Sequence, residues 1–265
     1  MQRLGKNIDR YAGETVDIRA TLRDIEAAAQ SHGWQRAIFH KTDEFEWVAY
    51  HRFPAGNNSS NRAPRIYLSS GIHGDEPAGL LAMRQLLQAN RWPANAELRL
   101  CPCLNPGGFA LNRRENAAGV DLNRQYRKPS SPETLAHINW LEQQPGFDLC
   151  LMLHEDWESH GFYLYEQNPD HQPSLAEPMI ESVAEVCPID SSPVIEGRPA
   201  HNGIIRPGVD PRERPLWPEA FYLITRKTRL SYTLEAPSDF PLATRVAALC
   251  TAVNTAVSLI TERIR

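Results

Sequence analysis

The sequence has little of what marks several classes of protein. Its formal net charge is only −4 over 265 residues and no block of basic residues stands out, so binding to nucleic acid is not expected. The first 20 residues contain no apolar core of a secretory signal. No stretch approaches the roughly 20 apolar residues that a membrane-spanning helix needs, so we expect no membrane association either.

Cysteine is also scarce, and its spacing follows no motif. The five cysteines include no Cys-x-x-Cys pair, which is the spacing that suggests thiolate zinc sites or redox chemistry. We therefore expect buried, reduced thiols, which are typical of cytosolic proteins, and we expect a cytoplasmic location.

What the sequence does contain is an alternation of strand patterns and helix patterns. Strands are expected at residues 35–41, 45–53, 65–71, 97–106, 148–156, 162–166 and 229–237. Helices are expected at residues 21–32, 77–90, 178–187 and 242–264. The first helix is placed between a capping pair, Thr21 and Asp24, and the stop signal Gly33. Strands separated by helices predict a layered α/β sandwich.

The stretch 188–218 differs from the rest, because it is rich in proline and has little periodicity. We expect a long ordered loop there, and such loops often carry function. No linker composition interrupts the chain elsewhere, so residues 1–265 are expected to form a single domain.

Three apolar strands end at polar residues that can bind a metal or move a proton. His73 and Glu76 follow one strand, His154 ends a second, and Glu235 ends a third. Ligands of α/β proteins bind beyond the carboxyl ends of the strands, so these side chains could converge. Two histidines and a glutamate are the ligand set of a catalytic zinc with one position left for water. The His-x-x-Glu spacing is weak by itself, however, and alone it favours an ordinary turn histidine at position 73.

A series of motifs strengthens the interpretation as a metal site. The segments GIHGDEPAG, NPGGF, RENAAGVDLNR, LMLHE and YTLEAPS follow one another in this order. Together they resemble the zinc carboxypeptidase family, in particular its short bacterial branch near the murein peptide amidases and the succinylglutamate desuccinylase/aspartoacylase group. The resemblance covers about residues 65–265 and leaves residues 1–60 outside.

The resemblance implies a fold and a metal centre. The fold is a three-layer α/β/α sandwich around a mixed, mostly parallel sheet. His73, Glu76 and His154 match the ligands of a zinc ion, so one Zn²⁺ per chain is expected. Glu235 matches the glutamate that acts as general base and then as general acid. Asp121 matches the carboxylate that orients the first histidine ligand from behind.

The resemblance also implies three groups that contact the substrate. Arg114 matches the arginine that polarises the scissile carbonyl, while Asn123 and Arg124 match the pair that grips a terminal carboxylate. Arginine suits a carboxylate because its planar fork can donate two parallel hydrogen bonds. The expected protein is therefore a zinc metallocarboxypeptidase that hydrolyses an amide bond next to a free carboxylate, with small or cell-wall peptides as substrates.

Two other functions are open at this point. An N-acyl amino acid deacylase of the desuccinylase type would use the same metal and the same glutamate on a small acylated amino acid. A catalytically silent binding homologue would keep the fold, but it would have no need for the metal set together with Glu235. Side-chain specificity and oligomeric state are left open by these residues.

Several other residues are given a place only by their position. Tyr222 lies in the part of the chain where the family has a tyrosine that closes over the substrate. His201 and Asn202 either line the pocket or form a structural turn. Glu155 and Asp156 follow the third expected ligand and are interpreted as rim residues.

Overall fold

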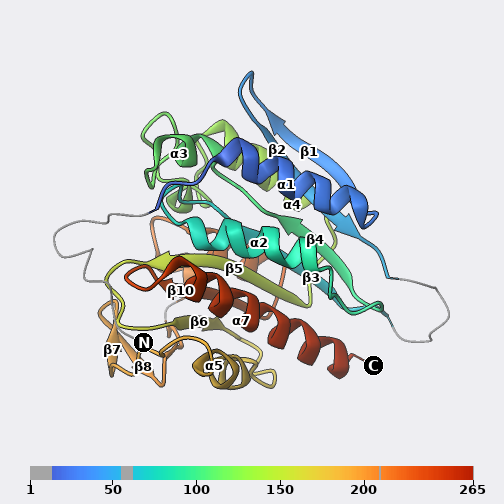
Figure 1. The fold of residues 1–265 in the computed structure, drawn as a ribbon. Helices are drawn as coiled ribbons and strands as arrows, with labels where there is room; N and C mark the ends of the chain where they lie inside the picture. Colours follow the sequence, from blue (N-terminus) through green and yellow to red (C-terminus); the bar gives the residue numbers. More distant parts are fainter. Residues whose placement is uncertain (1–13, 55–61, 209, 265) are drawn as a thin grey trace.

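The structure is a computed structural model that describes residues 14–54, 62–208 and 210–264. Figure 1 shows a twisted sheet with helices packed on its faces. Residues 1–13, which include most of the segment where no secretory signal is expected, lie outside the described part, as do residues 55–61, 209 and 265.

The sheet has ten strands in the order β1-β2-β4-β3-β5-β10-β6-β9-β8-β7. The strands are β1 (Gln35–Lys41), β2 (Glu46–Arg52), β3 (Arg65–Ser70), β4 (Glu97–Cys101), β5 (Leu149–Asp156), β6 (Tyr163–Gln167), β7 (Val194–Ile195), β8 (Arg198–His201), β9 (Ile204–Ile205) and β10 (Ser231–Pro237). The central strands β4, β3, β5 and β10 are parallel to one another. Pairing toward both edges is mainly antiparallel. The predicted mixed sheet is confirmed, but it is not mostly parallel: in the described residues four strand pairs are parallel, mainly at the centre, and five are antiparallel.

Helices cover both faces of this sheet. They are α1 (Ile18–Ser31), α2 (Pro77–Ala89), α3 (Pro106–Leu111), α4 (Pro132–Glu142), α5 (Ala176–Ala184), α6 (Glu219–Arg226) and α7 (Leu242–Arg263). In Figure 1, α1, α2, α5 and α7 lie in front of the sheet, and their apolar side chains share one hydrophobic cluster with it. Apolar side chains of α4 and α6 belong to a second cluster, which contains the alternate residues of β3 and β5. The predicted three-layer α/β/α sandwich is confirmed.

Two differences from the expected helices have a local cause. α1 begins at Ile18 rather than at residue 21, because the Asp17 side chain accepts a hydrogen bond from the Ala20 amide and caps the helix. The pair Thr21 and Asp24 therefore lies inside the helix and does not cap it. The helix α4, which the periodicity did not indicate, begins at Pro132 after the N-cap Ser131.

The proline-rich stretch 188–218 is more regular than expected. It contains β7, β8 and β9, which extend the sheet, and a short 3-10 helix at Pro211–Glu213. The turn between β7 and β8 consists of Glu196 and Gly197, with φ values of 51° and 67°. A two-residue turn with positive φ at both positions matches the twist of a hairpin, so this turn is well defined.

The closing helix α7 contradicts the expectation that no stretch is apolar enough for a membrane-spanning helix. It has 22 residues and is long and apolar enough to cross a membrane by length and composition. However, 61% of its most apolar window is buried inside the fold, where its side chains join the main hydrophobic cluster. Packing in the core therefore accounts for its composition.

All five cysteines are buried and free, as predicted. Burial raises the pKa of the Cys103 and Cys250 thiols to about 12. These thiols stay protonated at neutral pH, so neither is activated as a nucleophile.

Candidate metal centre and active site

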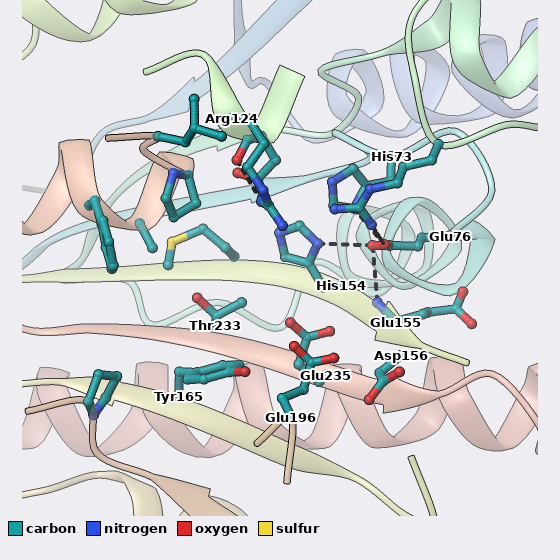
Figure 2. A pocket seen from close by; sticks show the side chains of 18 of the residues that line it. His73, Glu76, Arg124, His154, Glu155, Asp156, Tyr165, Glu196, Thr233 and Glu235 are labelled. Carbon is teal, nitrogen blue, oxygen red and sulfur yellow. Dashed lines mark hydrogen bonds and ion pairs between the residues drawn. The ribbon is translucent and has the colours of Figure 1, made fainter. Parts of the chain in front are cut away.

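Two histidines and one glutamate converge at the carboxyl ends of β3 and β5: His73 and Glu76 follow β3, and His154 lies near the end of β5. The candidate ligand atoms of His73, Glu76 and His154 all lie within 4.8 Å of one another, and all three residues are buried. Nδ1 of His73 is 2.5 Å from Glu76 Oε1, and Nδ1 of His154 is 2.9 Å from Glu76 Oε2 (Figure 2). Both imidazoles therefore direct the same ring nitrogen toward one carboxylate, and this donor set suits zinc.

Close backbone contacts hold the segments that carry these residues. A Cβ atom at Gly74 would come within 2.0 Å of the Gly108 backbone at the start of α3. A Cβ atom at Gly79 would come within 2.9 Å of the Leu153 carbonyl. The loop after β3 and the first turns of α2 are thus packed directly against α3 and β5, and glycine is required at both contacts.

Asp121 lies behind His73, on the side away from Glu76. Its Oδ1 atom is 3.5 Å from His73 Nε2, and its Oδ2 atom accepts a hydrogen bond from Arg114 Nε at 3.0 Å. Nη1 of Arg114 is in turn 3.7 Å from Glu76 Oε1. Asp121 therefore holds the Arg114 guanidinium beside the metal centre, and it lies on the side of His73 from which a carboxylate can orient a histidine ligand.

Burial and charge act against each other in this cluster. Burial by itself would raise the pKa of Glu76 and of Asp121, but the neighbouring His73 helps to lower both below their usual values. Burial also lowers the pKa of His154, whereas at His73 the attraction of Glu76 and Asp121 prevails and the pKa is raised. The carboxylates are thus ionised, which is the form that binds a divalent metal.

Glu235 lies beside His154 on the neighbouring strand. The two residues are register partners in the parallel pair of β5 and β10, so their side chains project from the same face of the sheet. Burial raises the pKa of Glu235 well above its usual value, and the carboxylates of Glu76 and Asp156 raise it further. A divalent cation held by the three ligands would oppose this shift, because a nearby positive charge favours a carboxylate.

Asn123 and Arg124 lie on a short 3-10 helix, η1 (Leu122–Arg124), which is capped by Asp121. Arg124 is exposed, and both residues line the same cavity as the metal centre. The side-chain oxygen of Asn123 accepts a hydrogen bond from the Glu219 backbone amide at 2.9 Å. The NH₂ group of Asn123 is therefore the part of this side chain that can donate to a ligand.

Glu219 is the centre of a buried polar cluster that the sequence reasoning missed. Its two carboxylate oxygens accept hydrogen bonds from the hydroxyls of Tyr67 and Ser69, each at 2.8 Å. The Tyr67 hydroxyl also lies 3.0 Å from Nε2 of His137. Burial raises the pKa of Glu219 to about 7, although both hydroxyl donors lower it. The cluster ties the first turn of α6 to β3 and so supports the position of Asn123.

The metal centre opens into a cavity of about 640 Å³. Of the eight residues to which the motif resemblance assigns a role, only Asp121 does not line this cavity. The sheet forms the floor of the cavity. There, Thr233 of β10 pairs with Met152 of β5 on one side and with Tyr165 of β6 on the other, and all three residues line the cavity. Thr233 and Met152 each lie two residues before the pair Glu235 and His154. The structure therefore places the expected base, the expected ligands and a substrate-sized space on one face of the sheet.

The β7–β8 hairpin adds two charges to the cavity wall that sequence reasoning also missed. Glu196, in the turn, and Arg198, at the start of β8, both line the cavity. The Arg198 guanidinium lies over the Tyr165 ring, 5.9 Å from its centroid. The one available signal was the length of the proline-rich stretch, since long loops beside such folds often carry function.

Two interpretations by position are settled by the packing. Tyr222 is buried in the cluster that contains the α4 side chains, with its ring 6.0 Å from that of Tyr126, and it does not line the cavity. The expectation that it could close over a substrate is therefore wrong, because it lies on the apolar face of α6. His201 ends β8 and Asn202, with a φ of 48°, begins the β8–β9 turn; both are exposed and do not line the cavity.

Glu155 and Asp156 line the cavity, as their interpretation as rim residues implied, but they do so from inside β5, which continues beyond His154, and both are buried. The Glu155 carboxylate forms an ion pair with Arg245. Asp156 accepts a hydrogen bond from the Tyr163 hydroxyl at 3.1 Å. Both residues therefore belong to the buried part of the cavity wall, and the carboxylates of both have partners within the fold.

Comparisons with known proteins show which proteins this chain resembles. Residues 62–185 match the succinylglutamate desuccinylase/aspartoacylase catalytic domain. Carboxypeptidase SOL1 of Arabidopsis thaliana is 31% identical over 99 residues, which are 29% of this chain and 20% of that protein. The chain thus spans about a fifth of the length of this curated relative.

Two solved structures share the fold over almost the whole chain. A protein of Shewanella amazonensis SB2B with a provisional metallopeptidase name superimposes with a TM-score of 0.79 at 23% identity, over 92% of this chain and 94% of that chain. A metallo-carboxypeptidase of Pseudomonas aeruginosa, in complex with (2-guanidinoethylmercapto)succinic acid, superimposes with a TM-score of 0.70 at 22% identity. That alignment covers 96% of this chain and 71% of the other.

The fold is that of the metallocarboxypeptidases. The resemblance to the zinc carboxypeptidase-like family that the motifs indicated is confirmed, and the family model that residues 62–185 match describes the desuccinylase/aspartoacylase catalytic domain.

Proposed function

We propose that the protein is a zinc-dependent carboxypeptidase that hydrolyses the amide bond next to the free carboxylate of a small peptide. The observation that carries the proposal is the convergence of the His73, Glu76 and His154 cluster with Glu235 in one cavity. Cell-wall peptides are the candidate natural substrates, on the basis of the motif resemblance.

The donor set fits a zinc ion. His73, Glu76 and His154 would hold it through two imidazole nitrogens and a carboxylate, with Asp121 increasing the basicity of His73 from behind. When bound there, zinc supplies a positive charge and lowers the pKa of a water ligand to about 7.

The residues around this centre have complementary tasks. Glu235, the register partner of His154, would take a proton from the attacking water and return it to the leaving amine. Arg114, which Asp121 holds beside Glu76, would stabilise the negative charge that develops on the carbonyl oxygen. Fixed donors of this kind act mainly on the transition state, so they should affect kcat more than substrate binding.

A carboxylate clamp would orient the substrate. The Arg124 fork and the NH₂ group of Asn123 both border the cavity, and both can donate to a terminal carboxylate. The side chain of the terminal residue would then extend over the floor formed by Thr233 and Tyr165. The wall charges of Glu196 and Arg198 favour a polar side chain there over a large apolar one.

The second candidate function is deacylation of an N-acyl amino acid. The match of residues 62–185 to the desuccinylase/aspartoacylase catalytic domain favours it. The same metal, base and clamp would serve, because an acylated amino acid also carries a carboxylate next to the scissile amide.

A matched set of substrates tests the proposal. Zinc-loaded protein is offered short peptides, the same peptides as C-terminal amides, and N-succinyl and N-acetyl amino acids, with Glu235→Gln protein as the blank. We expect release of the terminal amino acid from the free peptides and much slower cleavage of their amides. Turnover of the acylated amino acids alone would replace the carboxypeptidase assignment with the deacylase, and no turnover above the blank would refute both.

We also propose a cytoplasmic location. Five free, buried cysteines support it, because such thiols persist in a reducing compartment. Fractionation of cells that express the full chain is the test, and recovery outside the cytoplasmic fraction would contradict it.

A further inference from the structure

The first turn of α2 lacks the usual hydrogen bond from its own N-cap residue. A side chain at the N-cap position ordinarily accepts a hydrogen bond from a backbone amide two or three residues later. Here the N-cap residue is Glu76, and its side chain makes no such bond, because its two oxygens face His73 and His154. The buried helix start would keep an unpaired amide at Ala78 unless another group accepted it.

Glu155 supplies that acceptor from β5. Its Oε1 atom accepts a hydrogen bond from the Ala78 amide. Its own backbone amide donates to Glu76 Oε2 at 3.1 Å, which Figure 2 shows next to the bond from His154. Glu155 therefore contacts the helix start and the metal-binding carboxylate at the same time, and it directly follows another candidate ligand.

Arg245 compensates the charge of Glu155 in the interior. Both side chains are 0% exposed, and Glu155 Oε2 accepts hydrogen bonds from Arg245 Nη1 and from Ser238 Oγ, the latter at 3.0 Å. Arg245 also donates from Nε to the Phe240 carbonyl at 2.9 Å and pairs with Glu14. A buried carboxylate with both oxygens bonded in this way is held in one place, since breaking the pair would leave a buried charge unpaired.

We propose that Glu155, held by Arg245, is a positioning residue of the metal centre. It caps α2 in place of Glu76, and this frees the Glu76 carboxylate to bind the metal. The inference rests on the proposed zinc function. Its specific consequence is that metal affinity depends on a hydrogen-bond acceptor at position 155 rather than on the charge of the pair.

Two double variants separate the acceptor from the charge. Glu155→Gln/Arg245→Met removes both charges but keeps an amide oxygen that can accept from Ala78. Glu155→Leu/Arg245→Met removes both charges and the acceptor. Zinc dissociation constants, measured by competition with a chelator, should stay within about threefold of wild type in the first variant. In the second they should be about 10- to 100-fold weaker, the usual effect of losing a partner behind a metal ligand.

A matched control on α7, the helix that carries Arg245, separates an effect on the stability of the fold from an effect on zinc affinity. Val257 is buried in α7 away from the metal cluster, so Val257→Ala should lower the melting temperature of the metal-free protein without changing zinc affinity. Should the Glu155→Leu/Arg245→Met protein fail to fold, Glu155→Met is measured in its place, because Arg245 then keeps Glu14 and the Phe240 carbonyl as partners.

Equal zinc affinity in the acceptor-keeping and acceptor-lacking variants would overturn the inference, whether both match wild type or both are weakened alike. A wild-type protein that holds no stoichiometric zinc would overturn the proposed function together with it. The two failures are therefore distinguishable, and neither depends on an activity assay.

Discussion

Replacing Glu219 by glutamine should change how the stability of the fold depends on pH. The carboxyl group is buried between the hydroxyls of Tyr67 and Ser69, and its pKa is raised from 4.5 to about 7. Because the folded-state pKa lies above the unfolded-state value, the folded protein holds this proton more tightly than the unfolded chain does. The corresponding stability is complete below the unfolded-state pKa and is lost as the pH rises through about 7.

The size of the effect follows from the shift in pKa. At about 1.4 kcal/mol per pKa unit, a rise from 4.5 to about 7 corresponds to roughly 3 kcal/mol in the free energy of unfolding. Glutamine has nearly the same shape as glutamic acid and no titrating proton, so the Glu219→Gln variant should not lose this stability as the pH rises. Relative to the variant, the wild-type protein should lose roughly 3 kcal/mol between acidic pH and about pH 8.

Urea denaturation of both proteins, free of metal and measured across this pH range, gives the difference directly. All other titrating groups are present in both proteins, so their contributions largely cancel in the difference. The quantity compared is the difference in the free energy of unfolding between the wild type and the variant. If it changes by less than about 0.5 kcal/mol across the pH range, which is the usual error of additivity, that would falsify the raised pKa of Glu219.

Three further predictions concern the proposed chemistry. Wild-type protein should contain one zinc per chain and both His73→Ala and His154→Ala should lose it; metal analysis that finds full zinc in both variants would exclude this ligand set. Glu235→Gln should keep its zinc and melting temperature while kcat falls by about 10²- to 10⁴-fold, and wild-type kcat in a folded, zinc-loaded variant would exclude Glu235 as the proton shuttle. Arg124→Ala should lower kcat/KM for a peptide with a free carboxylate by about tenfold or more, with little change for its C-terminal amide; equal losses on both substrates would contradict a carboxylate clamp.

The convergence of the candidate site could be predicted from the sequence for a topological reason. The strands β3, β5 and β10 are short apolar runs, and each is followed or ended by a residue that can bind a metal or a proton. Parallel strands bring their carboxyl ends to one edge of a sheet, so His73, His154 and Glu235 had to approach one another once the strands were neighbours.

The contacts that hold these residues could not be predicted in the same way. Glu155 finds its partner Arg245 at a separation of 90 residues, and Asn123 is held by Glu219 at a separation of 96. Neither partner belongs to a motif, and both arrive only because α7 and α6 pack on opposite faces of the sheet. Local patterns describe single elements, whereas these hydrogen bonds depend on how elements dock.

α6 was missed for a related reason. It has only eight residues. Pro218, which precedes it, falls in the expected proline-rich loop, although a proline is also common at the start of a helix. Its apolar residues Tyr222 and Leu223 become recognisable as a buried face only when the second hydrophobic cluster is known. Short helices contain too few turns for their periodicity to stand out.

The β7–β8 hairpin suggests how relatives of this protein could diversify. The candidate ligands and Glu235 stand on or next to central strands, where a change at one position disturbs neighbours on both sides. Glu196 and Arg198, in contrast, reach the cavity from the hairpin turn and the first residue of β8, at the end of the strand order. Exchanging residues 194–201 as one cassette should therefore alter which substrates fit while the reaction itself is inherited unchanged, and new specificities would evolve at the margin of the sheet.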